Sequence, residues 1–245
     1  MRLMTCLVAA LLLAFGGTAR AERAVDVALV LLTDVSNSID DHEYALVKEG
    51  YRAAFSDPEV IAAIQGSHGG VAVAYVEFSG AHEVTLVQGW DHLTDAASSQ
   101  AFGAAVASAP RSSAGNTALA ASLRQAVRLL KEGGFGTARL VIDVASDHPG
   151  DSGRSAPIRD AAVADGITIN ALPIIGQHPA GTIDGQLTYT SAQWGWGGTT
   201  AFYRRDIIGG AGAFLVEAEN YDAFAAALKR KLLLELLISR YDELH

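Results

Sequence analysis

The sequence predicts an α/β protein with one doubly wound, mostly parallel central sheet and helices on both of its faces. Half of the 245 residues are hydrophobic and 18% are charged, a composition typical of globular domains. Short apolar runs rich in branched residues alternate with longer segments of helical periodicity. This alternation indicates crossover connections between parallel strands. Because no linker, internal repeat or low-complexity tract interrupts it, we expect a single domain.

Six short apolar runs predict the strands. The first reads DVALVLLT and is apolar along most of its length, as in a strand that is buried on both faces of a sheet. The run that follows Gly80 is shorter, and we expect it to be antiparallel at one edge. The predicted strands are Asp26–Thr33, Val71–Phe78, Glu83–Gln88, Leu140–Ala145, Ile167–Ile174 and Ala213–Glu217.

Apolar residues recur at helical spacing between these strands, most clearly in Asn116–Lys131. Asp57 and Pro58 end the first helix, because a residue before proline disfavours the α conformation. Pro157 opens a short helix. The predicted helices are Asp40–Phe55, Thr94–Ser108, Asn116–Lys131, Ala156–Ala164, Ala201–Ile207 and Tyr221–Ile238. The Gly-rich segment Gly176–Thr200 is expected to form a long loop.

The first 21 residues have the features of a secretory signal peptide. Arg2 gives a positive start, Leu7–Phe15 is an apolar core, and residues 19–21 form an Ala-x-Ala cleavage site. The alternative is a buried N-terminal helix. The signal peptide predicts that residues 22–245 form one exported domain, either periplasmic or secreted.

Composition excludes several classes of protein. The formal net charge of −9 argues against nucleic-acid binding, which needs a basic face. No later apolar run reaches the roughly 18 residues that a membrane span requires, so we expect no transmembrane segment. The single cysteine, Cys6, lies in the predicted signal peptide, which excludes a disulfide scaffold and a thiolate zinc site.

The loop after the first strand is the most informative segment. Asp34, Ser36 and Ser38 alternate there, so an extended backbone places the three side chains on one side. Carboxylate and hydroxyl oxygens are ligands for Mg²⁺, Mn²⁺ or Ca²⁺. The alternative is that Ser38 only caps the following helix.

Two further oxygen-bearing side chains are expected at the same edge of the sheet. Thr117 lies at the start of a predicted helix, and Asp147 follows the strand that ends near Ala145. Each also has a local alternative: Thr117 as a first-turn residue, and Asp147 as the cap of a turn. Because the carboxyl ends of parallel strands meet at one edge, the five residues together predict a site for a divalent cation.

This combination resembles the metal-ion-dependent adhesion site of von Willebrand factor type A (vWA) domains, over about residues 25–237. More narrowly, the chain resembles the DUF1194 family of exported bacterial proteins. The segments that carry the narrower resemblance are Asp57–Ile61, Tyr75–Glu77, Gly166–Asn170 and Ile208–Phe214. The resemblance implies that Ser36, Ser38 and Thr117 contact the ion, and that Asp34 and Asp147 bind it directly or through water. We expect Mg²⁺, with Mn²⁺ or Ca²⁺ as alternatives.

The chain departs from the vWA pattern at two positions. Asn37 stands where Gly is common in the first motif, and His148 stands where Gly commonly follows the last Asp. Neither residue replaces a proposed ligand. His148 could contact an acidic partner or crowd the site, or it could be an ordinary exposed loop residue.

The predicted donor set favours a binding function. Two acids and three neutral hydroxyls leave a divalent ion able to accept a carboxylate from a partner protein that presents Asp or Glu. We therefore expect an exported, metal-dependent protein-binding module. The alternatives are a metal-stabilised structural envelope protein and a metal-assisted hydrolase. The sequence has no Gly-x-Ser-x-Gly elbow, phosphate-binding loop or His-Glu-x-x-His motif, so we do not expect an enzyme.

Two more segments are candidates for partner contact or regulation. The long Gly-rich loop carries Tyr189, Trp194 and Trp196, which are either binding anchors or residues that attach the loop to the domain. The last helix is expected to pack on the sheet with its basic residues outside. The vWA resemblance implies that a shift of this helix is coupled to the geometry of the metal site. The sequence alone does not show whether this coupling exists here.

Overall fold

The structure is a computed structural model that describes residues 24–136, 138–148, 150, 154–175, 177–183, 186–191 and 198–242, and it describes only the backbone of 177–183, 186–191 and 238–242. The predicted signal peptide and the two tryptophans Trp194 and Trp196 lie outside these ranges. No helix within them is both long and apolar enough to cross a membrane.

The central sheet has five strands in the order β3-β2-β1-β4-β5. The strands are β1 (Val27–Asp34), β2 (Val71–Phe78), β3 (Val84–Leu93), β4 (Arg139–Ser146) and β5 (Ile167–Pro173). All neighbours pair in parallel except β2 and β3, which confirms the predicted antiparallel edge strand. That strand continues beyond Gln88, where the prediction ended it. The register shifts opposite Tyr75 break the alternation of side chains that marks a strand in the sequence, so the prediction stopped too early.

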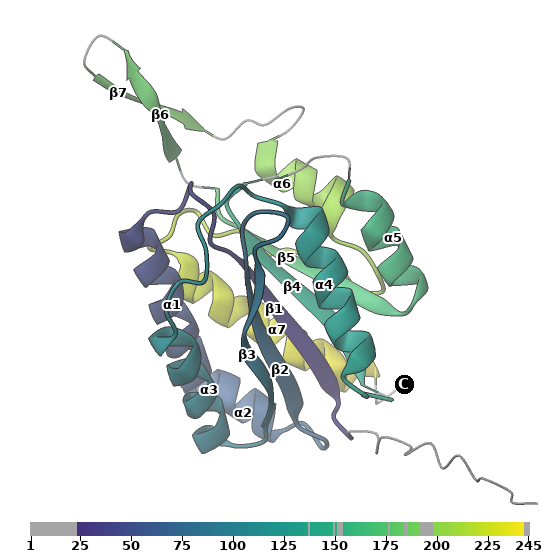
Figure 1. Cartoon of the computed structure of the whole chain (residues 1–245). Coiled ribbons are helices and arrows are strands. Elements are labelled where there is room, and N and C mark those ends of the chain that lie inside the picture. Colours follow the sequence, from purple (N-terminus) through teal and green to yellow (C-terminus); the bar gives the residue numbers. More distant parts are fainter. Residues whose placement is uncertain are drawn as a thin grey trace, which may run out of the picture.

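Helices cover both faces of the sheet, as predicted (Figure 1). One face packs against α1 (Asp41–Ser56), α2 (Pro58–Gln65), α3 (Ala96–Ser108) and α7 (Phe224–Asp242). The other face packs against α4 (Leu119–Glu132), α5 (Ala156–Ala164), α6 (Gly198–Phe202) and the π-helical turn η1 (Tyr203–Ile207).

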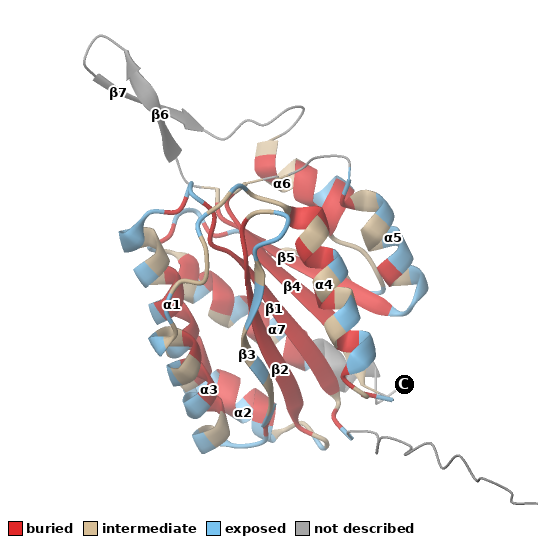
Figure 2. Cartoon of the chain, in the orientation of Figure 1, coloured by how far each residue is buried: buried red, intermediate tan, exposed pale blue. Residues whose placement is uncertain are grey.

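The core lies on both sides of β1, whose eight residues are all buried (Figure 2). Leu29 and Leu31 belong to the hydrophobic cluster beneath α1 and α7, together with Tyr51. Val30 and Leu32 belong to the cluster beneath α4 and α5. Successive side chains of a strand point to opposite faces, so this single apolar run supplies both layers and places its last residue at the carboxyl edge.

The helix α2 was missed by the sequence analysis. Asp57 does end α1, but its side chain also accepts hydrogen bonds from the backbone N–H groups of Glu59 (2.9 Å) and Val60 (3.4 Å). Pro58 then occupies the first turn of α2. The pair that stops one helix therefore also starts the next, because an aspartate cap followed by proline is a favoured helix start.

Two other predicted segments differ from the structure. The segment predicted as strand Ala213–Glu217 runs beside β5 with only isolated bridges, since Gly210 and Gly212 bend the preceding backbone with φ of 100° and 67°. Within the predicted loop Gly176–Thr200, the backbone forms a two-stranded antiparallel hairpin. Its strands are β6 (Gln177–Ile183) and β7 (Gln186–Ser191), and the latter contains Tyr189.

The helix α7 is attached to the sheet by buried charges. Arg230 is exposed as expected, but Lys231 is not. Lys231 is fully buried and pairs with Asp143 of β4. Lys231 Nζ also lies 3.3 Å from Glu235 Oε1. Arg139 pairs with the other carboxylate oxygen of Glu235 at 3.1 Å, and Asn170 donates to Oε1 at 2.5 Å. Two elements of the sheet thus hold the inner face of α7.

Candidate metal site

The five predicted ligand residues lie together at the carboxyl ends of β1 and β4. Asp34 is the last residue of β1, and Ser36 and Ser38 lie in the loop that follows it. Thr117 precedes α4, which begins at Leu119 instead of the predicted Asn116, and Asp147 directly follows β4. Since β1 and β4 are neighbouring parallel strands, the sheet itself brings the two carboxylates to one edge.

Hydrogen bonds join these side chains into one cluster. Thr117 Oγ1 donates to Ser36 Oγ at 2.9 Å, and the Ser36 and Ser38 hydroxyls lie 3.2 Å apart. Ser38 Oγ donates to Asp147 Oδ1 at 3.1 Å, and the Ser36 backbone N–H donates to Asp34 Oδ1 at 2.8 Å. The predicted ligands are therefore within reach of one another, although they come from three separate loops.

Two buried carboxylates give the cluster an unbalanced negative charge. Asp34 is 2% exposed and Asp147 is 1% exposed. Burial, followed by the nearby charge of Asp147, raises the pKa of Asp34 to about 7. A divalent cation between the loops would offset both effects, because it lowers the cost of burying the ionised form.

The donor set fits a hard divalent cation. All five side chains offer oxygen, which is the ligand type of Mg²⁺, Mn²⁺ and Ca²⁺. Across the described part of the chain, no three or more His, Cys, Asp or Glu side chains form a group able to hold a metal. Ser36, Ser38 and Thr117 would therefore have to supply hydroxyl oxygens beside the two carboxylates.

A cavity of about 470 Å³ opens over this cluster. The residues that line it are Ser36, Asn37, Ser38, Gly115, Asn116, Thr117, His148 and Gly150. The three hydroxyl residues of the cluster thus face the cavity, while neither carboxylate residue lines it. A ligand from solvent would approach a bound ion from the hydroxyl side.

His148 lies in the wall of this cavity, and its predicted contact with a partner stays a prediction. Its Nδ1 accepts a hydrogen bond from the Gly150 backbone N–H at 3.0 Å. Its carbonyl oxygen accepts a hydrogen bond from Tyr203 OH at 3.3 Å, and its backbone N–H donates to Ser146 Oγ at 3.2 Å. Ser146 Oγ donates to Asp34 Oδ2 at 2.6 Å, so it connects the His148 backbone to the cluster of predicted ligands.

The structure does not describe the side chains of the other predicted partner-contact residues. Trp194 and Trp196 lie outside the described residues, and Tyr189 is described only through the backbone of β7. Their predicted roles remain predictions.

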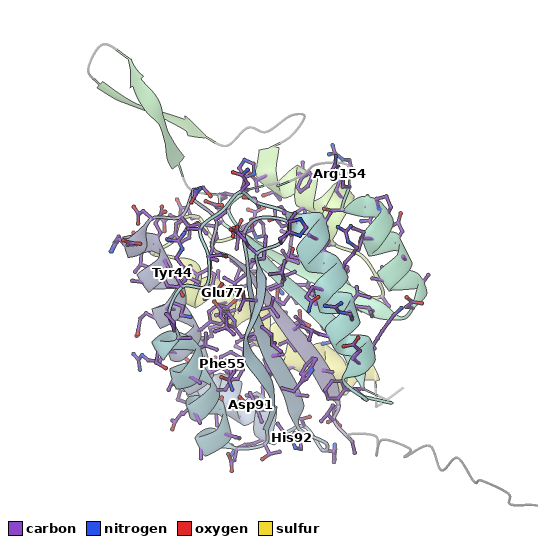
Figure 3. All side chains as sticks on the ribbon, in the orientation of Figure 1. Tyr44, Phe55, Glu77, Asp91, His92 and Arg154 are labelled. Atoms are coloured by element: carbon purple, nitrogen blue, oxygen red, sulfur yellow. The ribbon has the colours of Figure 1, made fainter. Side chains whose placement is uncertain are left out.

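A second cavity of about 410 Å³ lies away from the cluster and is lined in part by Trp90, Asp91 and His92. Figure 3 shows Asp91 and His92 at the opposite end of the sheet from Tyr44 and Glu77. His92 Nε2 lies 2.7 Å from the Gly69 carbonyl oxygen, a contact that connects β3 to the loop before β2. This end of the sheet contains none of the predicted ligand residues.

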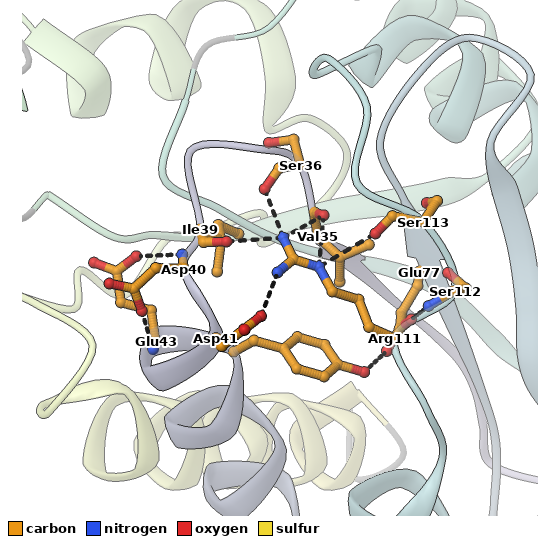
Figure 4. A network of polar contacts seen from close by, with 11 residues as sticks. Val35, Ser36, Ile39, Asp40, Asp41, Glu43, Glu77, Arg111, Ser112 and Ser113 are labelled. Carbon is orange, nitrogen blue, oxygen red and sulfur yellow. Dashed lines mark hydrogen bonds and ion pairs between the residues drawn. The ribbon is translucent and has the colours of Figure 1, made fainter.

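Arg111 holds the loop between Asp34 and α1, and the sequence analysis missed it. Its Nη2 donates to the carbonyl oxygens of Val35, Ser36 and Ile39 at 2.8 Å each (Figure 4). Its Nη1 lies 3.7 Å from the Asp41 carboxylate. Because a guanidinium group presents several donors in a fixed plane, one side chain can set the path of this loop.

Glu77 in turn positions the segment that carries Arg111. Its fully buried carboxylate accepts hydrogen bonds from Lys48 Nζ at 3.1 Å and Tyr44 OH at 2.9 Å. Its other oxygen accepts from the Ser112 backbone N–H at 2.9 Å. No spacing rule connects Arg111 or Glu77 to the Asp-x-Ser-x-Ser motif, since Arg111 binds mainly backbone carbonyl groups and the partners of Glu77 are mostly distant in sequence.

We expect Arg111→Ala to weaken metal binding about 10- to 100-fold, the usual cost of losing a group that supports metal ligands. The loop with Ser36 and Ser38 would lose the donors that fix its carbonyl groups. Isothermal titration with Mg²⁺ or Mn²⁺ measures the effect. Arg52→Ala is the matched control, because Arg52 pairs with Glu49 on the exposed side of α1. Equal affinities for the two variants would contradict this role for Arg111.

Solved structures with the same fold include a thread matrix protein and a pilus adhesin. Proximal thread matrix protein 1 (PTMP1) of the mussel byssus has a TM-score of 0.59 at 14% identity, over 88% of this chain and 48% of that chain. A second PTMP1 structure has zinc bound in its metal-ion-dependent adhesion site (MIDAS) motif. The pilus adhesin SpaC of Lactobacillus rhamnosus GG has a TM-score of 0.57 at 15% identity, over 85% of this chain and 30% of that chain.

The SpRpn10 VWA domain has a TM-score of 0.56 at 10% identity, over 83% of this chain and 94% of that chain. These likenesses show that the fold is vWA-like. The chain spans about half the length of the mussel protein and less than a third of the adhesin.

Comparison with curated protein sequences gives no match. The model of the family DUF1194, described as "Protein of unknown function", matches residues 24–239. That match covers most of the chain and all five clustered side chains. The protein therefore belongs to the DUF1194 family.

Proposed function

We propose that this protein is an exported, divalent-metal-dependent protein-binding module. Asp34, Ser36, Ser38, Thr117 and Asp147 would hold Mg²⁺, with Mn²⁺ or Ca²⁺ as alternatives. An Asp or Glu carboxylate of a partner protein would complete the coordination shell. The observation that carries this proposal is the hydrogen-bonded cluster of these five side chains beneath an open cavity.

The charge of the cluster supports binding of an anionic ligand only when a metal is present. The two acids balance a divalent cation, and the three hydroxyls add no further charge. A bound cation would supply an electrophilic position for a carboxylate that enters through the cavity. Without the cation, Asp34 and Asp147 would repel that carboxylate. Metal dependence is therefore built into the donor set.

Two of the solved relatives support an adhesion-type role. SpaC is a pilus adhesin, and PTMP1 is a thread matrix protein with a zinc-occupied MIDAS motif. We extend adhesion from the first protein, and an occupied metal motif from the second, to this chain. The signal peptide predicted from residues 1–21 supports export, to the periplasm or the medium. We assign binding and not catalysis, since coordination of a partner carboxylate by a metal ion held in the cluster needs no nucleophile and no proton-transfer group.

Affinity capture tests the proposal. The immobilised mature protein is exposed to cell-envelope extract with Mg²⁺ or with EDTA. We expect Mg²⁺-dependent retention of a protein, which is lost for Asp34→Asn and lost when carboxylates of the extract are first amidated. The proposal would be contradicted if the same protein were retained equally with EDTA and by the Asp34→Asn variant. If Mg²⁺ raised only the melting temperature, the structural-protein alternative would be correct.

Metal affinity should rise with pH. Metal binding needs ionised Asp34, whose pKa in the metal-free protein is raised to about 7. At a pH below this pKa, each ion that binds displaces a proton from Asp34. The metal affinity should therefore fall by about tenfold for each unit by which the pH is lowered. Calorimetry between about pH 5.5 and 8, in buffers with different ionisation enthalpies, measures both the affinity and the proton release.

The metal-free protein should show the opposite trend in stability. A carboxyl group whose folded pKa exceeds its unfolded pKa binds more protons in the folded state. The Asp34 contribution to the free energy of unfolding therefore falls as pH rises from about 4 to 7. Saturating Mg²⁺ should remove this fall. Metal affinity that stays constant over the same pH range would contradict the assignment of Asp34 as a ligand.

A further inference from the structure

We infer that Asn37 and Asn116 form a pair of carboxamides that bind the main chain of an extended peptide on either side of its acidic residue. This inference rests on the proposed function and specifies the partner chemistry at the same cavity. Both residues line that cavity beside the three hydroxyl residues. Asn37 lies between Ser36 and Ser38 in sequence, and Asn116 directly precedes Thr117.

The two asparagines are on loops that contact each other directly. The Asn37 backbone N–H donates to the Gly115 carbonyl oxygen at 2.9 Å. Both asparagines are exposed. Within the described part of the chain, neither carboxamide forms an intramolecular hydrogen bond. Each carboxamide offers N–H donors and a carbonyl acceptor, the same two functions as a peptide group, so it can pair with the backbone of a ligand.

The described residues that line the cavity favour a neutral peptide backbone over other ligand classes. Among the described residues that line it, none is Lys or Arg, so it lacks the cationic groups that bind phosphates or polyanions. None is Phe, Tyr, Trp or a large aliphatic residue, so these residues form no apolar wall for a hydrophobic side chain. Apart from the imidazole of His148, the side chains described there are hydroxyls and carboxamides.

The size of the cavity fits more than one carboxylate. Its volume of about 470 Å³ falls in the range of pockets that hold drug-sized ligands, roughly 300–1,000 Å³. An Asp or Glu side chain with the peptide groups that flank it would occupy such a space. The net charge of −9 disfavours ligands with several acids. The favoured ligand is therefore one acidic residue between small uncharged residues.

Peptide titration of the metal-loaded protein, followed by NMR, tests this inference. The probe is an acetylated, amidated Gly-Gly-Asp-Gly-Gly peptide, and its Asn analogue is the ligand control. We expect the Asp peptide to bind and the Asn peptide not to bind. N-methylation of the peptide groups that flank Asp should weaken binding. The Asn37→Ala/Asn116→Ala variant should bind the Asp peptide about tenfold more weakly, as expected for two lost hydrogen bonds.

Metal titration of the same variants separates this inference from the proposed function. The Asn37→Ala/Asn116→Ala variant should bind Mg²⁺ like the unmodified protein, and Gln125→Ala on the exposed face of α4 should change neither affinity. Unchanged peptide binding by the double variant would overturn the inference and leave the proposed function intact. Glucuronate bound as tightly as the Asp peptide would overturn it in favour of a sugar acid. A metal-loaded protein that binds no carboxylate at all would overturn both.

Discussion

Asp34→Asn will abolish metal binding without unfolding the protein. The substitution keeps the size of the side chain but removes one of the two charges that balance the cation. Because substitutions of groups that only support ligands cost about 10- to 100-fold in metal affinity, loss of a proposed charged ligand should cost more than about 100-fold. Isothermal titration with Mg²⁺ measures this loss. Asp165→Asn, an exposed carboxylate that pairs with Lys131, is the matched control.

The stability of the same variant distinguishes a metal site from a structural carboxylate. Burial and the charge of Asp147 raise the pKa of Asp34 to about 7, so the ionised form is unfavourable in the metal-free fold. We therefore expect the free energy of unfolding of metal-free Asp34→Asn near pH 8 to equal or exceed that of the unmodified protein. Mg²⁺ should stabilise only the unmodified protein. A variant that unfolds readily without metal would show that Asp34 serves the fold.

Lys231→Met will destabilise the fold by about 3–5 kcal/mol, the usual cost of removing one partner from a buried ion pair. The substitution leaves the buried carboxylate of Asp143 without its cation and removes one of the partners of Glu235. Urea denaturation measures the free energy of unfolding. Lys229→Met is the matched control on the same helix. Lys229 pairs with Asp57 and Glu59 at the surface, so its loss should cost less than about 1 kcal/mol.

The destabilisation by Lys231→Met should decrease in acid. Burial already raises the pKa of Asp143 to about 6 in the presence of Lys231, and removal of that cation raises it further. A carboxyl group with a raised folded pKa binds protons more strongly when folded, so the variant should recover stability as pH falls from about 8 to 5. Equal costs for the Lys231 and Lys229 substitutions would contradict a role of the buried charges in holding α7.

Local patterns predicted most of the fold because each depends on neighbouring residues. The apolar run of β1 and the helical spacing of α4 mark their elements without knowledge of the tertiary structure. The Asp57–Pro58 pair was ambiguous, since the same two residues end α1 and begin α2. The segment beside β5 has the composition of a strand, but its pairing is limited by the glycine bends before it.

Long-range pairing explains what the sequence could not predict. Lys231 and Glu235 have the spacing of an exposed helical ion pair, and only their contacts with Asp143 and Arg139 of β4 account for their burial. Arg111 acts on backbone carbonyl groups, which carry no sequence signature. The clustering of the five predicted ligand residues could be predicted, in contrast, because parallel strands bring the ends of β1 and β4 to one edge.

Calorimetric titration of the metal-stripped mature protein with Mg²⁺, Mn²⁺ and Ca²⁺, beside Asp34→Asn, is the most direct test of the central claim. We predict that one ion binds per protein molecule, that Mg²⁺ is among the ions bound, and that the variant binds none. Failure of every ion to bind the unmodified protein, or equal binding by the variant, would contradict a metal site at the carboxyl ends of β1 and β4.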